Sequence, residues 1–562
     1  MSSRQPDDNH GGSCTGEKAQ RVADAGLLQI RRGPPSSPGA AEDDIEGDID
    51  DGGQGGASRR DFLSLMGFSL GAVGLAGGCR APVQHAIPLP VATPEMVPGV
   101  ALTFATTCGA CPSSCALLVK QRDGRPIKID GNPDSPLFGG GTCATGQASL
   151  LSLYDGDRLR GPLWHGQPIS WTEIDEKIGA SLSALAAAGG EKSGRRIVLL
   201  SGTISSPSTK AVIGAWSRRF SHFRHVVADA VSASALREAS RRTFGRAVVP
   251  HFAFDKARVI VGLDADFLGT WLSPVEFAHA YAAGRRTAAR SSWLHVQIES
   301  GFSVTGSNAD LRIAVAPSEL GAVAAALYAR VARRARAVQS TQVRPGAGAD
   351  DDTNETALPA AASEARLDAI AEQLWQARGA SLVVSGSNDL DLQMLVAALN
   401  VLLDNVGRTV DLARGSLQRQ GSDRALVELT AQMAAGQVDA LVIYGANPAY
   451  DHPDGAAFIA ALNQVPLSIA LTSHRDETSA SVHAVCPDHH FLESWGDAEP
   501  VEGTLGLSQP LIAPLFSTRA APESLLRWIG HGTRHYDHVR DHWRREIFPR
   551  QTADADFDAF WD

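Results

Sequence analysis

Four cysteines that lie close together in the chain have the spacing of a metal-cluster site. Cys108, Cys111 and Cys115 follow a Cys-x2-Cys-x3-Cys pattern, and Cys143 comes after 27 intervening residues. Thiolates at such short spacings can surround one iron–sulfur cube, and a fourth thiolate on a returning loop completes the ligand set. The sequence therefore favours a 4Fe-4S cluster bound by all four.

Two other chemistries stay open for these thiols. A structural zinc ion also binds four cysteines, but a Cys-x2-Cys pair followed by a third cysteine four positions later is unusual for zinc. Disulfide bonds are the second alternative in an exported protein. The residues between the cysteines, such as Gly109 and Ala110, are small. Small residues favour the cluster because they let backbone N–H groups approach the sulfurs.

The residues around the cysteines predict a small β-hairpin domain. Residues 116–121 alternate loosely between apolar and polar, and residues 126–130 form a matching return strand. Asp123-Gly124 between them is a strong hairpin turn signal. Three glycines at 139–141 let the backbone fold tightly before Cys143. We expect a 4Fe-4S domain over residues 100–164.

After residue 165 the pattern changes to helices that alternate with short apolar strands. This alternation predicts an α/β fold with doubly wound parallel sheets. The helix is expected at 173–188 and the clearest strands at 197–200, 259–261, 294–298, 382–385, 440–444 and 467–471. We expect two α/β blocks, 165–336 and 366–510, with a linker or insert over 337–365 and a helical tail over 511–562.

The first 99 residues have features of targeting rather than of a folded core. Residues 1–57 are rich in Gly, Ser, Pro and Asp and predict a disordered acidic tail. Arg59 and Arg60 precede a short, Gly-rich apolar stretch, so residues 58–79 are typical of a twin-arginine export signal or anchor. Cys79 ends a stretch similar to a lipoprotein box and is a candidate lipid anchor, with an unmodified thiol as the alternative. Residues 80–99 contain five prolines and predict an extended spacer.

The composition excludes some classes of protein. Hydrophobic residues make up 43% and charged residues 20% of the 562, as in ordinary globular proteins with large cores. A net charge of −11 argues against nucleic acid as a partner. The sequence contains no run of about 20 apolar residues, so we expect no membrane-spanning helix.

Several motifs resemble one enzyme family. They are the four cysteines, Asp123 to Pro133 (DGRPIKIDGNP), Gln147-Ala148, Leu153 to Arg158, Asp264 to Leu268, Gly445 to Pro448 and Pro487 to Asp497. Together they are similar to the dimethyl-sulfoxide-reductase superfamily of molybdopterin bis-guanine-dinucleotide oxidoreductases. Within it, the motifs look most like polysulfide-reductase-like subunits and the molybdopterin-like part of the iron–sulfur subunit of alternative complex III, a quinol-oxidising respiratory complex.

The resemblance implies cofactors, partners and a location. The cofactors would be the 4Fe-4S cluster and a molybdopterin guanine dinucleotide carrying molybdenum or tungsten, with Asn447 in the pterin-contacting loop. The partners would be a ferredoxin-like iron–sulfur subunit, a quinone-binding membrane subunit and cytochrome c. The protein would be exported by the twin-arginine route to the periplasmic face of the cytoplasmic membrane.

The sequence departs from the family pattern at three places. Neutral Thr145 stands two residues after the fourth cysteine, where the family usually has Lys or Arg. The stretch that usually supplies the metal ligand contains no cysteine, which leaves Asp229, Ser232 and Ser234 as candidates. The family ends with a β-rich domain that closes over the dinucleotides, and we expect this capping domain to be absent from residues 511–562.

These features predict an iron–sulfur redox subunit of a membrane-associated, quinone-linked respiratory complex. One alternative is an active molybdenum or tungsten reductase or dehydrogenase of the polysulfide or thiosulfate reductase type. The other is a degenerate structural scaffold without pterin. No nucleophile–base pair stands out in the sequence, so no catalytic residue is predicted.

Overall fold

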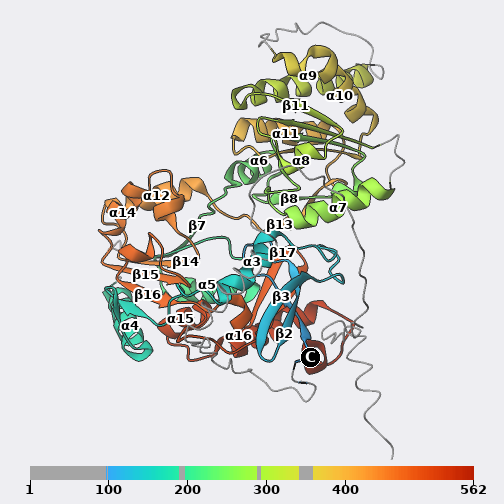
Figure 1. Cartoon of the computed structure of the whole chain (residues 1–562). Coiled ribbons are helices and arrows are strands. Elements are labelled where there is room, and N and C mark those ends of the chain that lie inside the picture. The colour runs from blue at the N-terminus through green and yellow to red at the C-terminus, as the bar shows by residue number, and fades with distance from the viewer. Residues whose placement is uncertain (1–96, 98, 189–195, 288–292, 341–357) are drawn as a thin grey trace, which may run out of the picture.

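The computed structural model describes residues 97, 99–188, 196–287, 293–340 and 358–562 (Figure 1). The predicted tail and signal, with Arg59, Arg60 and Cys79, lie outside these residues, as do most of the spacer and residues 341–357 of the predicted linker. Within the described residues, no helix combines the length and the apolar character needed to cross a membrane.

The cysteine-bearing region is a three-stranded antiparallel sheet with one helix, in the order β1-β2-β3. Its elements are β1 (Leu102–Thr107), β2 (Ala116–Arg122), β3 (Arg125–Gly131) and α3 (Ala144–Leu153). The predicted hairpin is confirmed, with Asp123 and Gly124 at φ angles of 51° and 79°. Two successive positive φ angles are typical of the type I′ turn that matches the twist of paired strands. The hairpin places Cys115 immediately before β2.

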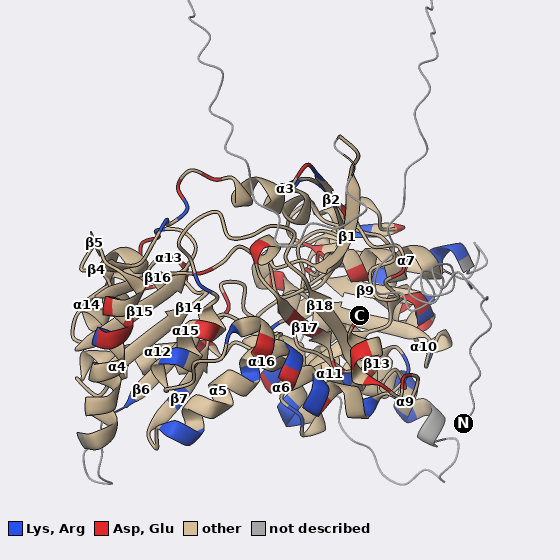
Figure 2. Ribbon diagram, turned by 90° about the horizontal axis from the view of Figure 1, so that it is seen from below, with Lys and Arg blue, Asp and Glu red and all other residues tan. Residues whose placement is uncertain are grey.

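A seven-stranded sheet forms the largest layer of the molecule, in the order β5-β4-β16-β15-β14-β6-β7. Five neighbouring strands, from β16 to β7, run parallel, and the β4–β5 hairpin adds an antiparallel edge. The strands are β4 (Leu163–Trp164), β5 (Gln167–Pro168), β6 (Ile197–Ser201), β7 (Phe223–Val227), β14 (Ala440–Tyr444), β15 (Leu467–Thr472) and β16 (Ala484–Pro487). The central strands β6, β14 and β15 contain no charged residue and are tan in Figure 2, whereas blue Lys and Arg residues lie on surrounding helices.

Helices cover both faces of this sheet, which explains its continuous apolar strands. Ile178 and Trp216 pack on one face, and Met433 and Phe458 on the other. The helices of the first face are α4 (Trp171–Ala188), α5 (Pro207–Arg219) and α15 (Ala521–Trp528); those of the second are α12 (Asp423–Ala434) and α14 (Gly455–Leu462).

A second, four-stranded parallel sheet lies in the upper lobe of Figure 1, in the order β11-β10-β9-β12. Its strands are β9 (Val259–Leu263), β10 (Leu294–Glu299), β11 (Leu311–Ala314) and β12 (Ser381–Ser385). The helices of this lobe are α6 (Ser234–Phe244), α7 (Pro274–Thr287), α8 (Val304–Ser307), α9 (Leu320–Ser340), α10 (Glu364–Gln376) and α11 (Leu390–Leu402).

A further sheet of four antiparallel strands, in the order β18-β17-β13-β8, was not predicted from the sequence. Its strands are β8 (Val249–Phe252), β13 (Val410–Ser416), β17 (Gly496–Val501) and β18 (Thr504–Ser508). β13 and β17 contain glycine and charged residues, β18 is interrupted by Gly506 and β8 by Pro250 and His251, so these strands lack the apolar runs that marked the others.

The two parallel sheets do not correspond to the two expected sequence blocks. The seven-stranded sheet pairs β6 from the first block with β14 from the second, and the four-stranded sheet pairs β9 with β12. Apolar runs identify strands but not their partners, because the crossover between two parallel strands has a minimum length but can span much of the chain. The chain therefore contributes β6 and β7 to the seven-stranded sheet, then forms the four-stranded parallel sheet, and then returns to add β14, β15 and β16 to the first.

The last residues are helical, as expected for a tail over 511–562. After α15 follow α16 (His535–His542), a turn of π-helix (Trp543–Ile547), a 3₁₀ turn (Phe548–Arg550) and α17 (Phe557–Trp561). Trp543, Phe557 and Trp561 form a small apolar cluster against Trp495. This cluster holds the tail against the body of the molecule.

Candidate iron–sulfur site

The predicted cluster ligands are placed by three elements of the hairpin domain. Cys108 follows β1, Cys111 and Cys115 lie in the loop before β2, and Cys143 caps the N-terminus of α3. The Cys108 N–H donates to the Cys115 carbonyl at 2.8 Å and closes the loop. Ser114 permits this tight turn in a left-handed conformation, with φ 49°.

The four thiols interact with one another. Burial, together with the nearby Cys111 and Cys143, raises the pKa of Cys108 to about 11, although a hydrogen bond from the Ala110 backbone opposes the shift. Burial also raises the pKa of Cys115, and the other three cysteines add to that effect. Ionising Cys108 and Cys115 in the absence of metal is therefore unfavourable, because both are buried and negative charges would accumulate in one small space. Iron would supply the compensating positive charge and displace the protons.

Gly146 shows how closely the loop and the helix approach. A Cβ atom at this glycine would lie 3.7 Å from the Cys143 sulfur and 3.9 Å from the Cys108 sulfur. The Gly146 N–H also donates to the Cys143 sulfur at 3.3 Å. Hydrogen bonds of this kind tune the potential of iron–sulfur clusters.

One wall of the site comes from a segment almost 400 residues further along the chain. Phe491 lies against the cysteine loop so tightly that a Cβ at Gly109 would fall 2.5 Å from the Phe491 Cβ. Leu492 joins Cys108 and Cys115 in one buried apolar cluster. The opposite side is more open, because Cys111 is exposed and a cavity of about 410 Å³ lies beside Cys143.

A buried ion pair holds that wall in place. Arg158 donates to both carboxylate oxygens of Glu493, at 3.0 and 2.6 Å, and neither side chain is exposed. Burial by itself would raise the pKa of Glu493, but the hydrogen bonds from Arg158 and from two backbone N–H groups lower it. His490 adds a further contact, since its ring bonds Ser149 O and the Ser152 hydroxyl of α3. Sequence spacing could not reveal this link, because its partners are remote in the chain.

The described residues contain no disulfide bond. The five cysteines described there are all free. In that part of the chain, no three His, Cys, Asp or Glu side chains are grouped closely enough to hold a single metal ion.

Comparison with known proteins identifies a family match for the cysteine-bearing region. The family model for the molybdopterin oxidoreductase Fe4S4 domain matches residues 102–155, which include all four cysteines. Residues 102–155 are a molybdopterin oxidoreductase Fe4S4 domain. The Fe4S4 domain thus comprises the β1-β2-β3 sheet and α3.

Two curated proteins are similar to longer or shorter parts of the chain. The menaquinone reductase molybdopterin-binding-like subunit of Nitratidesulfovibrio vulgaris is 27% identical over 466 residues, 77% of this chain and 65% of that protein. The arsenate respiratory reductase molybdopterin-containing subunit of a Shewanella species is 33% identical over 121 residues, 21% of this chain and 14% of that protein. The chain thus spans less than two thirds of the length of these relatives.

The fold has a counterpart among solved structures. Acetylene hydratase from Pelobacter acetylenicus superimposes with a TM-score of 0.56 over 76% of this chain and 69% of its own, at 12% sequence identity. This likeness concerns the fold alone.

The residues expected near a second metal lie outside the Fe4S4 domain. Asp229 accepts four hydrogen bonds, from the N–H and hydroxyl of Thr203 and from the N–H groups of Gln420 and Gly421. Its carboxylate therefore ties the loops after β6 and before α12 together. Ser232 accepts from the N–H of Ser234, at the start of α6. The side chains of Asp229 and Ser232 thus make local structural contacts, and Ser234 takes part through its backbone N–H.

Asn447 is similarly engaged. Its side-chain N–H donates to Glu477 at 2.7 Å, and its oxygen accepts from the hydroxyl and the N–H of Thr478. These bonds join the loop after β14 to the loop after β15. Thr145 lies exposed in the first turn of α3, beside the cluster ligands.

Proposed function

We propose that the chain is the electron-transfer subunit of a multi-subunit oxidoreductase, with a 4Fe-4S cluster on Cys108, Cys111, Cys115 and Cys143. The observation that carries the proposal is the meeting of these four thiols inside a domain matched by the Fe4S4 family model. Bound there, the cluster would accept and donate one electron at a time.

The surroundings of the thiols suit such a role. Cys108 and Cys115 are buried, and apolar side chains such as Leu117 and Leu492 shield them from water. Cys111 is exposed, so one edge of the site is accessible to a partner. We infer that electrons enter or leave at the Cys111 edge, because Cys111 is the exposed cysteine of the four.

We do not assign molybdenum or tungsten chemistry to this chain. The carboxylate of Asp229 already accepts four hydrogen bonds, and both ends of the Asn447 amide are engaged. A metal ligand at Asp229 would have to break the contacts that join two loops. The second candidate function, an active enzyme with a molybdopterin guanine dinucleotide, is supported by the relatives that are named molybdopterin-containing reductases.

Elemental analysis of the full chain separates the two functions. After anaerobic purification we expect about four irons per chain, a broad absorbance typical of thiolate-bound clusters, and no molybdenum or tungsten. Cys111→Ala should lose or convert the cluster, whereas the control Cys486→Ala, in strand β16, should retain it. Full iron in Cys111→Ala would reject the cluster assignment, and stoichiometric molybdenum with extractable pterin would establish the second function.

We further propose that the complex is quinone-linked and membrane-associated. The relative named as a menaquinone reductase subunit supports this. The partners would be a ferredoxin-like iron–sulfur subunit and a quinone-binding membrane subunit, with cytochrome c as a further acceptor or donor.

The route to the membrane is a separate part of the proposal. Arg59 and Arg60 would direct export to the periplasmic face, and Cys79 would carry a lipid. Replacing both arginines with lysine should leave the protein in the cytoplasm, because the transport receptor recognises the paired guanidinium groups. An unchanged distribution after cell fractionation would reject the export signal, and labelling with a fatty-acid analogue, with Cys79→Ala as control, tests the lipid.

A further inference from the structure

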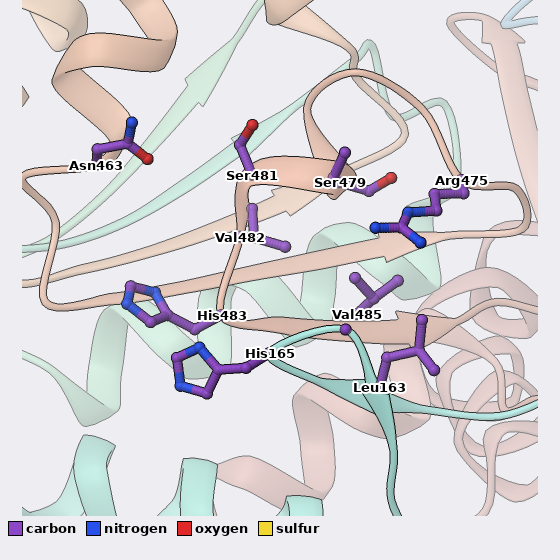
Figure 3. Close-up of a pocket in the computed structure, with 11 residues that line it drawn as sticks. Leu163, His165, Asn463, Arg475, Ser479, Ser481, Val482, His483 and Val485 are labelled. Atoms are coloured by element: carbon purple, nitrogen blue, oxygen red, sulfur yellow. The ribbon is translucent and has the colours of Figure 1, made fainter.

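A cavity of about 320 Å³ lies at the edge of the seven-stranded sheet, away from the Fe4S4 domain (Figure 3). One side is the β4–β5 hairpin with His165, and the other is the connection from β15 to β16 with Arg475 and His483. Asn463, at the end of α14, closes the top. None of these residues contributes to the cluster site.

The hydrogen bonds of His483 fix which ring nitrogen carries the proton. Its Nδ1 accepts from the backbone N–H of Ser468 at 3.1 Å and contacts the Ser468 hydroxyl at 2.7 Å. The neutral ring must therefore carry its hydrogen on Nε2. No acceptor for this N–H is found among the described residues, and the His165 ring meets the His483 ring edge-on at 5.2 Å.

Arg475 is exposed and forms no ion pair with another described residue. Its acidic neighbours are engaged elsewhere: Asp476 accepts from the Ser479 N–H, and Glu477 accepts from Asn447. Figure 3 shows the Arg475 guanidinium directed toward the middle of the labelled group, with the Asn463 amide on the opposite side. Among the described residues, the Arg475 guanidinium and the His483 Nε2–H therefore face the cavity without a protein acceptor.

The β4–β5 hairpin places His165 at this cavity in a left-handed backbone conformation. His165 has a φ of 47° in the first position of a two-residue turn, followed by Gly166 at 76°. Asn, Asp and Gly are the residues that usually fill that position, because they tolerate a positive φ. Histidine also tolerates a positive φ better than most residues, and here its ring lines the cavity beside His483.

We propose that this cavity binds a small organic anion, with a phosphate, sulfonate or carboxylate head held by Arg475, His483 and Asn463. Charge-assisted hydrogen bonds from a guanidinium are the strong contacts for such heads. Leu163, Val482 and Val485 form the apolar part of the lining, which fits a short apolar body attached to the head. A divalent metal on the two histidines is disfavoured, because the Arg475 charge would repel it.

Calorimetric titration of the full chain tests the proposal, with phenyl phosphate as the probe and benzyl alcohol as its uncharged counterpart. We expect phenyl phosphate to bind and benzyl alcohol not to bind. Arg475→Gln should weaken phenyl phosphate about tenfold or more, the loss typical of one charged hydrogen bond. The control Arg218→Gln, at an exposed arginine near the end of α5, should bind like the wild type.

Three results would overturn the proposal: no binding of phenyl phosphate, equal affinity in Arg475→Gln and wild type, or tight zinc binding that requires His165 and His483. The iron content of Arg475→Gln should equal that of the wild type, since the residue contacts no part of the Fe4S4 domain. Failure here therefore leaves the electron-transfer function untouched, and failure of that function leaves the anion site standing.

Discussion

At the scale of single residues, the site differs from its family pattern chiefly at Thr145. The residue is exposed on the first turn of α3, two positions after Cys143. A neutral side chain there provides no charge to stabilise an added electron on the cluster. The potential of the site therefore depends more on backbone N–H groups, such as that of Gly146, and on the apolar wall.

The first prediction restores the missing charge. Thr145→Lys should raise the reduction potential of the cluster by on the order of tens of millivolts, because a cation nearby favours the reduced state and solvent screens part of the effect. A redox titration followed by electron paramagnetic resonance measures the shift. Thr145→Val is the uncharged control and should leave the potential near that of the wild type. Equal potentials in the lysine and valine variants would show that position 145 does not influence the cluster.

Residue types and short spacings were enough to predict four ligands, because all four cysteines come from one continuous segment, and the Fe4S4 family model covers that segment. The roles of Asp229 and Asn447 were not accessible in this way. Each side chain is occupied by partners from another loop, Asp229 by Gln420 and Gly421, Asn447 by Glu477 and Thr478. Such contacts depend on the fold and leave no local trace in the sequence.

At the scale of elements, the cysteine loop depends on glycine for its contact with the rest of the chain. Gly109 allows the loop to lie directly on Phe491, and the added methyl group of an alanine would collide with its Cβ. Phe491 is in turn fixed by the short 3₁₀ turn Phe491–Glu493, which His490 caps through the Leu492 N–H. The loop and the turn therefore form one packed unit.

The second prediction tests this contact. Gly109→Ala should destabilise the protein by about 1–3 kcal/mol, the usual cost of overpacking, and should speed the loss of iron on exposure to a chelator. Gly161→Ala is the matched control, since a Cβ at Gly161 meets nothing within 4 Å. Both properties can be followed by thermal unfolding and by the decay of cluster absorbance. A Gly109→Ala protein with the same chelator sensitivity as Gly161→Ala would contradict the packing argument.

The elements themselves were partly predictable. The strands at 440–444 and 467–471 and the hairpin at Asp123-Gly124 were found where the sequence placed them. Strands buried between helices are continuously apolar, and a type I′ turn needs particular residues, so both leave a strong pattern. β13 and β17 were missed, because their pairing partners rather than their own residues make them strands.

At the scale of the whole molecule, the Arg158–Glu493 pair joins the end of the Fe4S4 domain to the segment that follows the seven-stranded sheet. It lies behind the wall formed by Phe491 and Leu492. A bidentate pair without solvent is costly to break, because the remaining charge stays buried without its partner.

The third prediction follows from this burial. Arg158→Met should destabilise the protein by about 3–5 kcal/mol, since it leaves the Glu493 carboxylate without its counter-ion. Arg534→Met removes an exposed pair with Asp537 and should cost at most about 1 kcal/mol. Urea unfolding of both variants provides the comparison. If both variants lost a similar amount of unfolding free energy, the buried pair would stabilise the protein no more than the exposed one.

The order of strands in the seven-stranded sheet also has a consequence for how the protein is made. β6 and β7 leave the ribosome long before β14, β15 and β16, which complete the same sheet. Until then, Val198 and Leu200 lack α12 and α14, which later cover them. Nascent chains halted before residue 440 should therefore be degraded quickly by added protease and should recruit chaperones. Chains released at full length should resist the same protease, because the sheet can close only when its last strands arrive.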